Sequence, residues 1–391
     1  MSNYPTYKLG DVAEIILGQS PESKFYNTKG VGLPFFQGKT EFTDWFPIPN
    51  KWCTEPKKIA EPFDVLLSVR APVGPTNIAK EKCCIGRGLA AIRYADCYKY
   101  VLYYLRSVSK YLESKATGTT FSSISGDTIK NLPIPLPPLP TQRAIVTRIE
   151  TLFAELDKAV QHLRTAQQQL KTYRQAVLNH WLNNEDGKWE MVPIKEIINV
   201  ISNGSTPKAD KMFSKGEIQF LKVYNLNFDG SINLSKEPVF IDRETHETLL
   251  KRSQTKQGDV LINIVGPPLG KVSIVPEGEK EYNINQAIVM FRPNEFVTSK
   301  FLAYYLMSPQ VIAWLTSTSK ATAGQFNVKV STCREIMFPK ISLSEQQRIV
   351  AEIESRLSQA SAAEASIENA LQQAEALRQS ILKKAFEGEL V

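Results

Sequence analysis

The sequence predicts an α+β protein in which two similar mixed α/β domains are joined by two long helices packed as an antiparallel coiled coil. Three observations predict it. The 391 residues exceed what one ordinary domain core holds. Short motifs recur in the same order about 200 residues apart. Each copy ends in a long stretch without Gly or Pro. We therefore predict four segments, at residues 1–140, 141–182, 183–343 and 344–391.

The repeat extends over nearly the whole chain. Each motif of the first half has a counterpart in the second, and the order is kept. The matched pairs are Gly18-Gln19-Ser20-Pro21 with Gly204-Ser205-Thr206-Pro207, Phe63-Asp64-Val65-Leu66-Leu67 with Gly258-Asp259-Val260-Leu261-Ile262, Ala71-Pro72 with Gly266-Pro267, Tyr103-Tyr104-Leu105 with Tyr304-Tyr305-Leu306, Phe121 with Phe326, and Leu139-Pro140-Thr141-Gln142 with Leu343-Ser344-Glu345-Gln346. Two copies of one plan follow from this order.

The first segment, residues 1–140, predicts a mixed domain. It is rich in Gly, Pro and short apolar runs, a texture typical of short strands and loops. One helix is expected from about Tyr98 to Glu113. A cluster of five prolines between Pro133 and Pro140 is expected to stop regular structure. Residues 183–343 repeat this plan.

The second and fourth segments predict long helices. Apolar residues recur every seven positions in residues 141–182, as a coiled-coil seam requires. The seam positions are Ile149, Leu156, Leu163, Leu170 and Val177, with Ile145, Leu152, Ala159, Ala166 and Tyr173 between them. Residues 344–387 carry a similar stripe, made of Ile349, Ile353, Leu357, Ala360, Ile367, Leu371, Ala374, Leu377, Ile381 and Ala385. A helix of about 65 Å needs a partner along its length, so we expect the two helices to pair antiparallel.

The distribution of charge favours a polyanionic partner. The net charge of +7 divides into +5 for residues 1–140, +3 for the first helix, +2 for residues 183–343 and −3 for residues 344–391. The helices have opposite signs, as expected of partners, while both mixed domains are basic. Lys and Arg contacts to phosphate supply most non-specific affinity for nucleic acid, and a rigid spacer suits two contact sites on duplex DNA.

Composition excludes several other classes of protein. The chain has no apolar run long enough to span a bilayer and no signal-peptide pattern, so a cytoplasmic protein is expected. Its five cysteines form no regular set and are expected to be reduced. No two of its three histidines share a metal-ligand spacing, so no metal site is expected.

Catalytic motifs are incomplete or missing. Gln37-Gly38-Lys39-Thr40 resembles the end of a phosphate-binding loop, but Leu33 stands where the first glycine is required. Gly86-Arg87-Gly88 lacks the third glycine of a dinucleotide site. A GxSxG elbow and the Asn/Asp-Pro-Pro-aromatic tetrapeptide of amino-methyltransferases are absent. We predict no catalytic residues. Lys39 and Lys222 look like a shared lysine at an edge strand, which suggests a DNA contact instead.

The remaining candidates are loop residues of the types that contact DNA. Arg and Lys favour guanine and phosphate, Asn and Gln favour adenine, and Ser and Thr are less selective. The candidates are Lys24, Lys39, Arg70, Arg87, Lys115, Thr117, Thr119 and Thr120 in the first domain, and Lys208, Lys222, Asn225, Asn285, Gln286, Lys320 and Gln325 in the second. The repeat aligns Arg87 with Gln286 and Thr120 with Gln325. For any single residue, a solvated surface position is the alternative interpretation.

The arrangement resembles the specificity subunits of type I restriction-modification systems over almost all 391 residues. Its motifs are Lys8-Leu9-Gly10-Asp11-Val12, Gly18-Gln19-Ser20-Pro21, Asp64-Val65-Leu66-Leu67, Gly258-Asp259-Val260-Leu261 and Leu132-Pro133-Ile134-Pro135-Leu136-Pro137-Pro138-Leu139, followed by Gln142-Arg143. The second half departs from the proline-rich pattern at residues 336–343 but regains Glu345-Gln346-Gln347. Each motif alone is weak, and their double occurrence in order is specific.

The resemblance implies two target-recognition domains, each contacting half of a split, asymmetric DNA site, with the helices setting the gap. It implies that modification subunits, which carry S-adenosylmethionine and methylate adenine N6, dock against the helical region, where Gln142, Arg143, Gln346 and Gln347 are the candidate contacts. It further implies restriction subunits that use ATP and Mg. No cofactor is expected on this chain, and the bound methyltransferase is expected to extrude the target base. Because the repeats are similar, the two partner subunits are expected in pseudo-twofold positions.

Two other functions remain open from the sequence. One is a self-contained DNA methyltransferase or nuclease with an unrecognised site. The other is a coiled-coil adaptor that binds protein, which would lack the steep salt dependence of phosphate binding.

Overall fold

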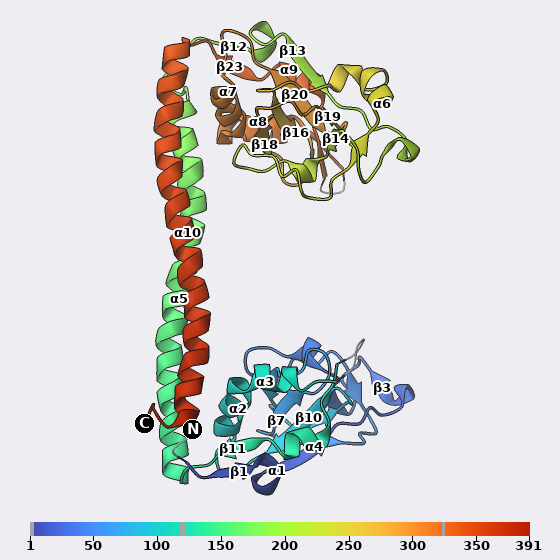
Figure 1. Cartoon of the computed structure of the whole chain (residues 1–391), viewed down its shortest axis with the longest axis vertical. Helices are drawn as coiled ribbons and strands as arrows, with labels where there is room; N and C mark the ends of the chain where they lie inside the picture. Colours follow the sequence, from blue (N-terminus) through green and yellow to red (C-terminus); the bar gives the residue numbers. More distant parts are fainter. Residues whose placement is uncertain (1–3, 118–121, 323–324) are drawn as a thin grey trace. The chain divides into compact units, whose positions relative to one another are not determined.

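The structure is a computed structural model that describes residues 4–117, 122–322 and 325–391. The chain forms two compact units (Figure 1). The first comprises Met1–Arg164 with Glu368–Val391, and the second comprises Thr165–Ile367. Each unit therefore holds one mixed domain and one part of each long helix.

The described residues of the first unit form three small sheets. One is four-stranded and antiparallel, in the order β2 (Glu14–Leu17), β10 (Leu89–Arg93), β7 (Val65–Ser68), β8 (Thr76–Ile78). A five-stranded sheet has the order β3 (Tyr26–Asn27), β5 (Trp52–Cys53), β4 (Leu33–Phe36), β9 (Cys83–Ile85), β6 (Ile59–Ala60), with β4 and β9 parallel. A third pairs β1 (Thr6–Lys8) with β11 (Pro133–Pro135). The helices are α1 (Leu9–Val12), α2 (Tyr98–Ser107), α3 (Ser109–Ser114) and α4 (Gly126–Lys130), with 3-10 helices at Ser23–Phe25 and Lys39–Glu41.

The second unit repeats this plan. Its four-stranded sheet has the order β13 (Val200–Asn203), β20 (Ile288–Arg292), β16 (Val260–Asn263), β18 (Val272–Ile274). Beside it lie β15 (Phe240–Ile241), β14 (Ile218–Leu221) and β19 (Tyr282–Ile284), with β14 and β19 parallel, and β12 (Met191–Pro193) pairs with β23 (Met337–Pro339). A further sheet has the order β17 (Val265–Gly266), β22 (Gln325–Asn327), β21 (Lys320–Thr322). The helices are α6 (Arg243–Glu247), α7 (Ser299–Met307), α8 (Pro309–Thr318) and α9 (Val330–Arg334), with 3-10 helices at Ile194–Glu196, Ala209–Lys211, Val223–Asn225 and Lys251–Ser253.

The long helices α5 (Leu139–Leu182) and α10 (Leu343–Glu387) lie side by side (Figure 1). In the second unit, Arg174 of α5 pairs with Glu364 of α10, while Trp181, further along α5, lies against the earlier Arg356 of α10. The helices are therefore antiparallel, which confirms the predicted coiled coil. In the first unit, Arg378 of α10 pairs with Asp157 of α5.

The predicted seam of α5 is correct at every seventh residue and at Ile145, Leu152 and Ala166 between them, and it is wrong at two positions. Leu156, Leu163 and Leu170 are half-buried. In contrast, Ala159 and Tyr173 are exposed, and the next residues along, Val160 and Arg174, are half-buried instead. In a heptad the two seam positions can be separated by three and then four residues, or by four and then three. The apolar residues of the sequence alone did not distinguish these two spacings. In α10, Leu377 is likewise exposed and the next residue, Arg378, is half-buried.

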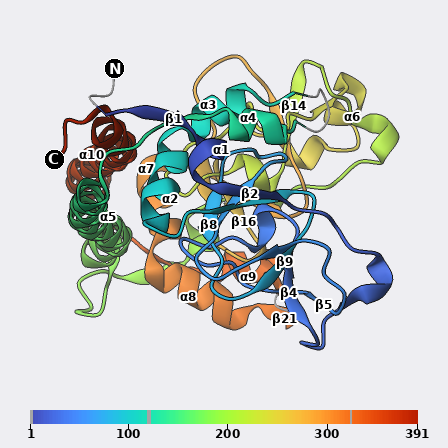
Figure 2. The same cartoon turned by 90° about the horizontal axis from the view of Figure 1, so that it is seen from below.

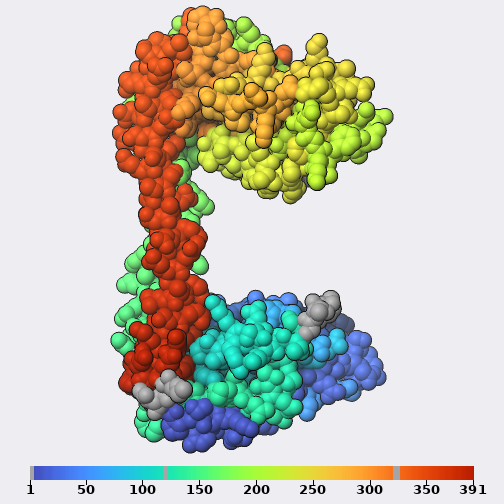
Figure 3. Space-filling view, viewed as in Figure 1, coloured from blue at the N-terminus to red at the C-terminus, as the bar shows by residue number. Residues whose placement is uncertain are grey.

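Each mixed domain buries apolar surface against both helices. In the first unit, Ile145 and Ile149 of α5 share a core with Ile381 and Ala385 of α10 and with α2. Figure 2 shows α2 between the helix pair and the strands of this domain, and Figure 3 shows the end of α10 against the domain surface. The equivalent core of the second unit contains Val177, Leu178 and Leu182 of α5 with Ile349 and Ile353 of α10.

Two local predictions differ from the structure. The helix expected from Tyr98 to Glu113 is interrupted at Val108, where the Ser107 hydroxyl donates to the Tyr104 carbonyl and competes with the backbone. The proline cluster was expected to be irregular, but Pro133–Pro135 pairs with β1. Pro140 lies in the first turn of α5, where a backbone N–H would have no intrahelical partner.

None of the helices in the described residues has the length and apolar composition that a membrane-spanning helix needs.

Candidate nucleic-acid interface

A basic groove lies on the first domain where four chain segments meet. It has a volume of about 640 Å³ and is formed by Ser20, Gln37, Gly38, Lys39, Thr40, Arg70, Ala71, Pro72, Arg87 and Gly88. The structure thus brings together three predicted residues, Lys39, Arg70 and Arg87, all of them exposed. No acidic residue lines the groove, and among the described residues none of these three cations has an ion-pair partner. Such a surface attracts phosphate, because the positive charge is not neutralised within the protein.

Close backbone packing holds the groove loops in place. A Cβ at Gly18 would lie 2.1 Å from the carbonyl oxygen of Gly86, and one at the matched Gly204 would lie 1.9 Å from that of Ile284. Both positions therefore require glycine, which explains why the glycine of the first repeated motif recurs. The Ser20 hydroxyl accepts a hydrogen bond of 3.3 Å from the Arg87 backbone N–H.

A buried ion pair stabilises the four-stranded sheet of each domain. In the first, Arg93 donates to both carboxylate oxygens of Asp64 at 3.0 and 2.9 Å. Its counterpart joins Arg292 to Asp259 at 2.9 and 2.8 Å. The hydrogen bonds that Arg93 donates to Asp64 raise the pKa of Arg93, although its partial burial lowers that pKa. Asp64 and Asp259 therefore belong to the framework and not to the groove.

Other candidates of the first domain lie outside the groove lining. The Lys24 ammonium is 2.8 Å from a Glu22 carboxylate oxygen. Lys115 is exposed, with its ammonium 5.4 Å from the centre of the Tyr111 ring. Thr117 exchanges backbone hydrogen bonds with Ser123. Thr119 and Thr120 lie outside the described residues.

In the second domain the candidates separate into exposed and buried groups. Lys208 and Gln286 are exposed, and Lys222 is half-buried. Asn285 accepts a hydrogen bond from the Ala287 N–H. Lys320 and Gln325 begin the adjacent strands β21 and β22.

Asn225 has a structural role that the sequence did not reveal. It is buried, accepts from the Lys222 N–H and donates to the carbonyls of Asn233 and Lys236. Its amide therefore holds a loop closed and is not available at the surface.

The backbone register changes three of the predicted matches. Lys222 directly precedes the 3-10 helix Val223–Asn225, and in the first domain the residue that directly precedes the 3-10 helix Lys39–Glu41 is Gly38. Lys222 therefore corresponds to Gly38 and not to Lys39. The strands β4 and β14 are central strands of their sheets and not the edge strands that were expected. Ser123 pairs with Arg70 as Asn327 pairs with Val265, which matches Phe326 with Ser122. Phe121, the predicted counterpart of Phe326, lies outside the described residues. The proposed equivalence of Thr120 and Gln325 falls partly outside the described residues.

The third change concerns the prolines after β7 and β16. The Ser68 hydroxyl donates to the carbonyl of Pro72 at 2.9 Å, whereas the matched Asn263 amide donates to that of Pro268 at 3.0 Å. The second domain therefore has one extra residue here, and Pro72 corresponds to Pro268, not to Pro267.

Two of the four predicted partner contacts are buried within their own domains. Gln142 accepts from the Tyr94 hydroxyl and donates to the Pro137 carbonyl, and the matched Gln346 accepts from the Thr298 N–H and donates to Phe296 and Ile341. Both glutamines therefore join the start of a long helix to its domain. Arg143 and Gln347, at the next matched position, are exposed.

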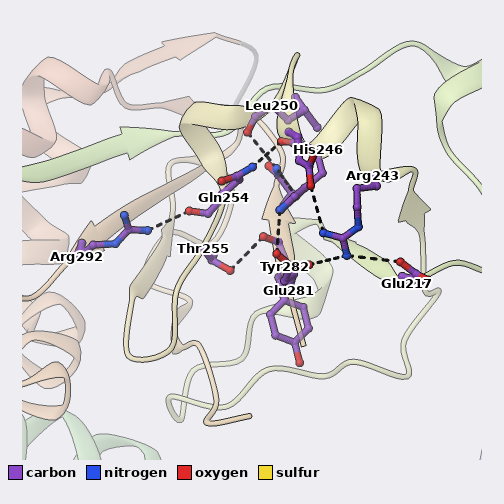
Figure 4. Close-up of polar contacts among 11 residues, drawn as sticks. Glu217, Arg243, His246, Leu250, Gln254, Thr255, Glu281, Tyr282 and Arg292 are labelled. Atoms are coloured by element: carbon purple, nitrogen blue, oxygen red, sulfur yellow. Dashed lines mark hydrogen bonds and ion pairs between the residues drawn. The ribbon is translucent and has the colours of Figure 1, made fainter. Parts of the chain in front are cut away.

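A polar network joins α6 to residues at and before β19 (Figure 4). Arg243 of α6 bonds Glu281 at 2.8 Å, just before β19. His246 is buried, and its Nδ1 lies 3.2 Å from the side-chain nitrogen of Asn283 within β19. Burial lowers the pKa of His246. The network joins α6 to the strand that leads into Asn285 and Gln286.

Sequence reasoning missed Ser20 and Thr206 as members of the site. Ser20 bonds the Arg87 backbone, and the Thr206 hydroxyl bonds the Gln286 side-chain oxygen. The repeated Gly-x-Ser/Thr-Pro motif could have identified them, because a hydroxyl occupies the same place in both copies. Within the described residues, His, Cys, Asp and Glu form no group of three or more that could hold a metal ion.

Comparison with known proteins gives consistent matches. The family model described as the type I restriction modification DNA specificity domain matches residues 1–163 and 186–373. The MjaX type I restriction enzyme specificity subunit of Methanocaldococcus jannaschii is 39% identical over 42% of this chain and 39% of that protein. The EcoBI specificity subunit of Escherichia coli is 27% identical over 98% of this chain and 85% of that protein.

Solved structures match the fold along nearly the whole chain. A chain from a structure on complex assembly and conformational transition of the type I R-M system gives a TM-score of 0.72 at 19% identity, over 99% of this chain and 98% of that one. The HsdS subunit from Thermoanaerobacter tengcongensis gives 0.56 at 20% identity, over 99% and 97%. The solved structures confirm the fold, and the family model and the relatives confirm the predicted specificity-subunit class over a self-contained enzyme or an adaptor. The family model covers most of the sequence in both repeats, and the chain therefore belongs to the type I restriction-modification DNA specificity family.

Proposed function

We propose that this chain is the non-catalytic DNA-recognition subunit of a cytoplasmic type I restriction-modification complex. Each mixed domain contacts one half of a bipartite, asymmetric DNA site, and the paired helices set the gap between the halves. Two modification subunits, which bind S-adenosylmethionine, methylate adenine N6, and restriction subunits supply ATP- and Mg-dependent cleavage. Membership of the family supports this assignment.

The basic groove of the first domain is the main structural support for DNA binding. Three unneutralised cations converge on one surface, and Gln37, Thr40 and Ser20 add neutral hydrogen-bonding groups beside them. Lys and Arg position a duplex through its phosphates, Arg also pairs with guanine, and amides and hydroxyls contact base edges. The groove therefore offers both kinds of contact.

The matched construction of the two units supports two similar partner surfaces. Each unit presents an exposed polar residue, Arg143 or Gln347, directly after a buried glutamine at the start of a long helix. Similar surfaces bind similar partners, so two modification subunits are expected, one for each helix start.

The salt dependence of DNA binding tests the groove. Replacing Lys39, Arg70 and Arg87 together by Gln should reduce the slope of log affinity against log salt by about 2 or more, because each cation that neutralises a phosphate contributes about 0.9 and at least two of the three are expected to do so. A control replaces three exposed lysines outside the groove, Lys80, Lys158 and Lys171, by Gln and should retain the slope. Equal slopes for the wild type and the groove variant would refute the groove as the DNA surface.

A methyl-transfer assay tests the division of labour. The purified chain alone should transfer no methyl group from S-adenosylmethionine to DNA, and addition of the modification subunit should produce methylated adenine. Transfer by the chain alone would instead favour a self-contained methyltransferase.

A further inference from the structure

The same type of backbone turn occurs in both domains, and each copy of the turn exposes one polar side chain. In the first domain the Gly86 N–H donates to the Phe36 carbonyl at 2.8 Å, and the turn closes with the Leu89 N–H on the Gly86 carbonyl at 3.0 Å. In the second, Asn285 donates to Leu221 at 3.1 Å, and Ile288 closes the turn on Asn285 at 3.1 Å. Arg87 and Gln286 are the second residues of these turns and are matched by backbone geometry.

The side chains at this matched position differ in hydrogen-bonding chemistry. Arg87 is exposed on the rim of the groove, and within the described parts of the chain its guanidinium has no carboxylate partner. Gln286 is also exposed, and its side-chain oxygen accepts the Thr206 hydroxyl. That bond orients the amide and leaves one oxygen lone pair and the NH₂ group for another molecule.

The residue beside this turn also differs in chemistry between the two domains. The residue that follows Val69 in the first domain is Arg70, and the one that follows Ile264 in the second is Val265. Val69 donates to the carbonyl of Gly88 and Ile264 to that of Ala287, so both positions lie beside the turn. The first domain thus has two guanidiniums where the second has an amide and an apolar side chain.

We propose that Arg87 specifies a guanine in the half-site of the first domain and that Gln286 specifies an adenine at the corresponding place in the half-site of the second. This inference rests on the proposed function, in which each domain contacts one half-site. A guanidinium matches the two acceptors, O6 and N7, of guanine in the major groove, and a carboxamide matches the donor and acceptor, N6 and N7, of adenine. Thr206 acts as a positioning residue for Gln286.

Reciprocal substitutions in the full chain, assembled with its modification subunit, test the assignment. Methylation is measured on a library of duplexes with both half-sites randomised. Arg87→Gln should change one position of the first half-site from G·C to A·T, with the relative preference shifted about 5- to 150-fold. Gln286→Arg should make the opposite change in the second half-site only. Thr206→Val should weaken the adenine preference without affecting the first half-site.

The control is Lys80→Gln, an exposed lysine beyond β8, which should leave both half-sites unchanged. If Arg87→Gln lowers methylation equally for all sequences, Arg87 contacts a phosphate and the inference is wrong. The inference also fails if either substitution alters both half-sites. In each of these cases the proposed function still holds if the wild-type complex methylates a bipartite site. A wild-type complex that recognises no bipartite site refutes the proposed function itself.

Discussion

At the scale of single residues, the two domains share a buried ion pair that the groove does not use. Asp259 is 1% exposed, binds Arg292 through both oxygens and also accepts from the Lys256 N–H at 2.6 Å. Removing the carboxylate leaves a guanidinium and a backbone N–H without their partner. The pair therefore matters more for stability than an exposed ion pair does.

Asp259→Ala should reduce the free energy of unfolding of the second unit by roughly 2 to 4 kcal/mol, because it breaks a largely buried pair. Denaturant unfolding followed by fluorescence measures this change. The control is Lys195→Ala, which removes an exposed pair with Glu335 and should cost less than about 1 kcal/mol. An Asp259→Ala protein as stable as the control would contradict the framework role.

His246 should make the stability of the second unit depend on pH. Its pKa is lowered in the folded protein, chiefly by burial, while Glu281 opposes that change and Arg243 adds to it. The unfolded chain therefore takes up the proton more readily, and stability present above pH about 6.5 is lost as the pH falls toward the folded-state pKa.

His246→Gln should flatten the fall in melting temperature between pH 7.5 and 5.5, since glutamine does not titrate. The matched control is His162→Gln, at an exposed position of α5. An unchanged pH slope in His246→Gln would show that another group controls the transition.

At the scale of elements, polar residues fix how the helices pair. Arg174 of α5 bonds Ser361 and Glu364 of α10, and Arg378 of α10 pairs with Asp157 of α5. Arg174 lies three positions before Val177, the first buried apolar residue near the end of α5. Arg378 lies three positions before Ile381, the corresponding residue of α10. Polar residues within an apolar seam specify register, so both helix segments have a preferred alignment.

Inserting seven residues after Leu170 should keep the apolar face of α5 and displace Arg174 from Ser361 and Glu364 by one heptad. Under the proposed function, the gap in the methylated DNA site then changes while both half-site sequences remain. Methylated-adenine mapping gives both quantities. Changed half-sites with an unchanged gap would show that the helices do not set the spacing.

The sequence predicted the elements better than their exact matches. Two domains, two long helices and the equivalence of Arg87 with Gln286 followed from the repeat. The extra residue before Pro268 and the shift of Lys222 did not, because side-chain bonds to the backbone define those registers. Burial of Gln142, Gln346 and Asn225 was also hidden, since glutamine and asparagine are ordinarily exposed and their partners are distant in sequence.

At the scale of the whole molecule, each unit is built from one mixed domain and parts of both helices. The two domains should therefore act as separate recognition modules. Replacing residues 1–140 by the equivalent segment of another family member should change one half-site and leave the other and the gap unchanged. Methylation mapping of the hybrid complex measures this, and a change in both half-sites would contradict modular recognition.

The proposed recognition of a split DNA site can be tested by mapping the adenines that the wild-type chain and its modification subunit methylate on genomic DNA. We expect one asymmetric bipartite motif, with two different half-sites separated by a fixed gap and methylation in each half. A single contiguous motif, or methylation without sequence preference, would contradict it.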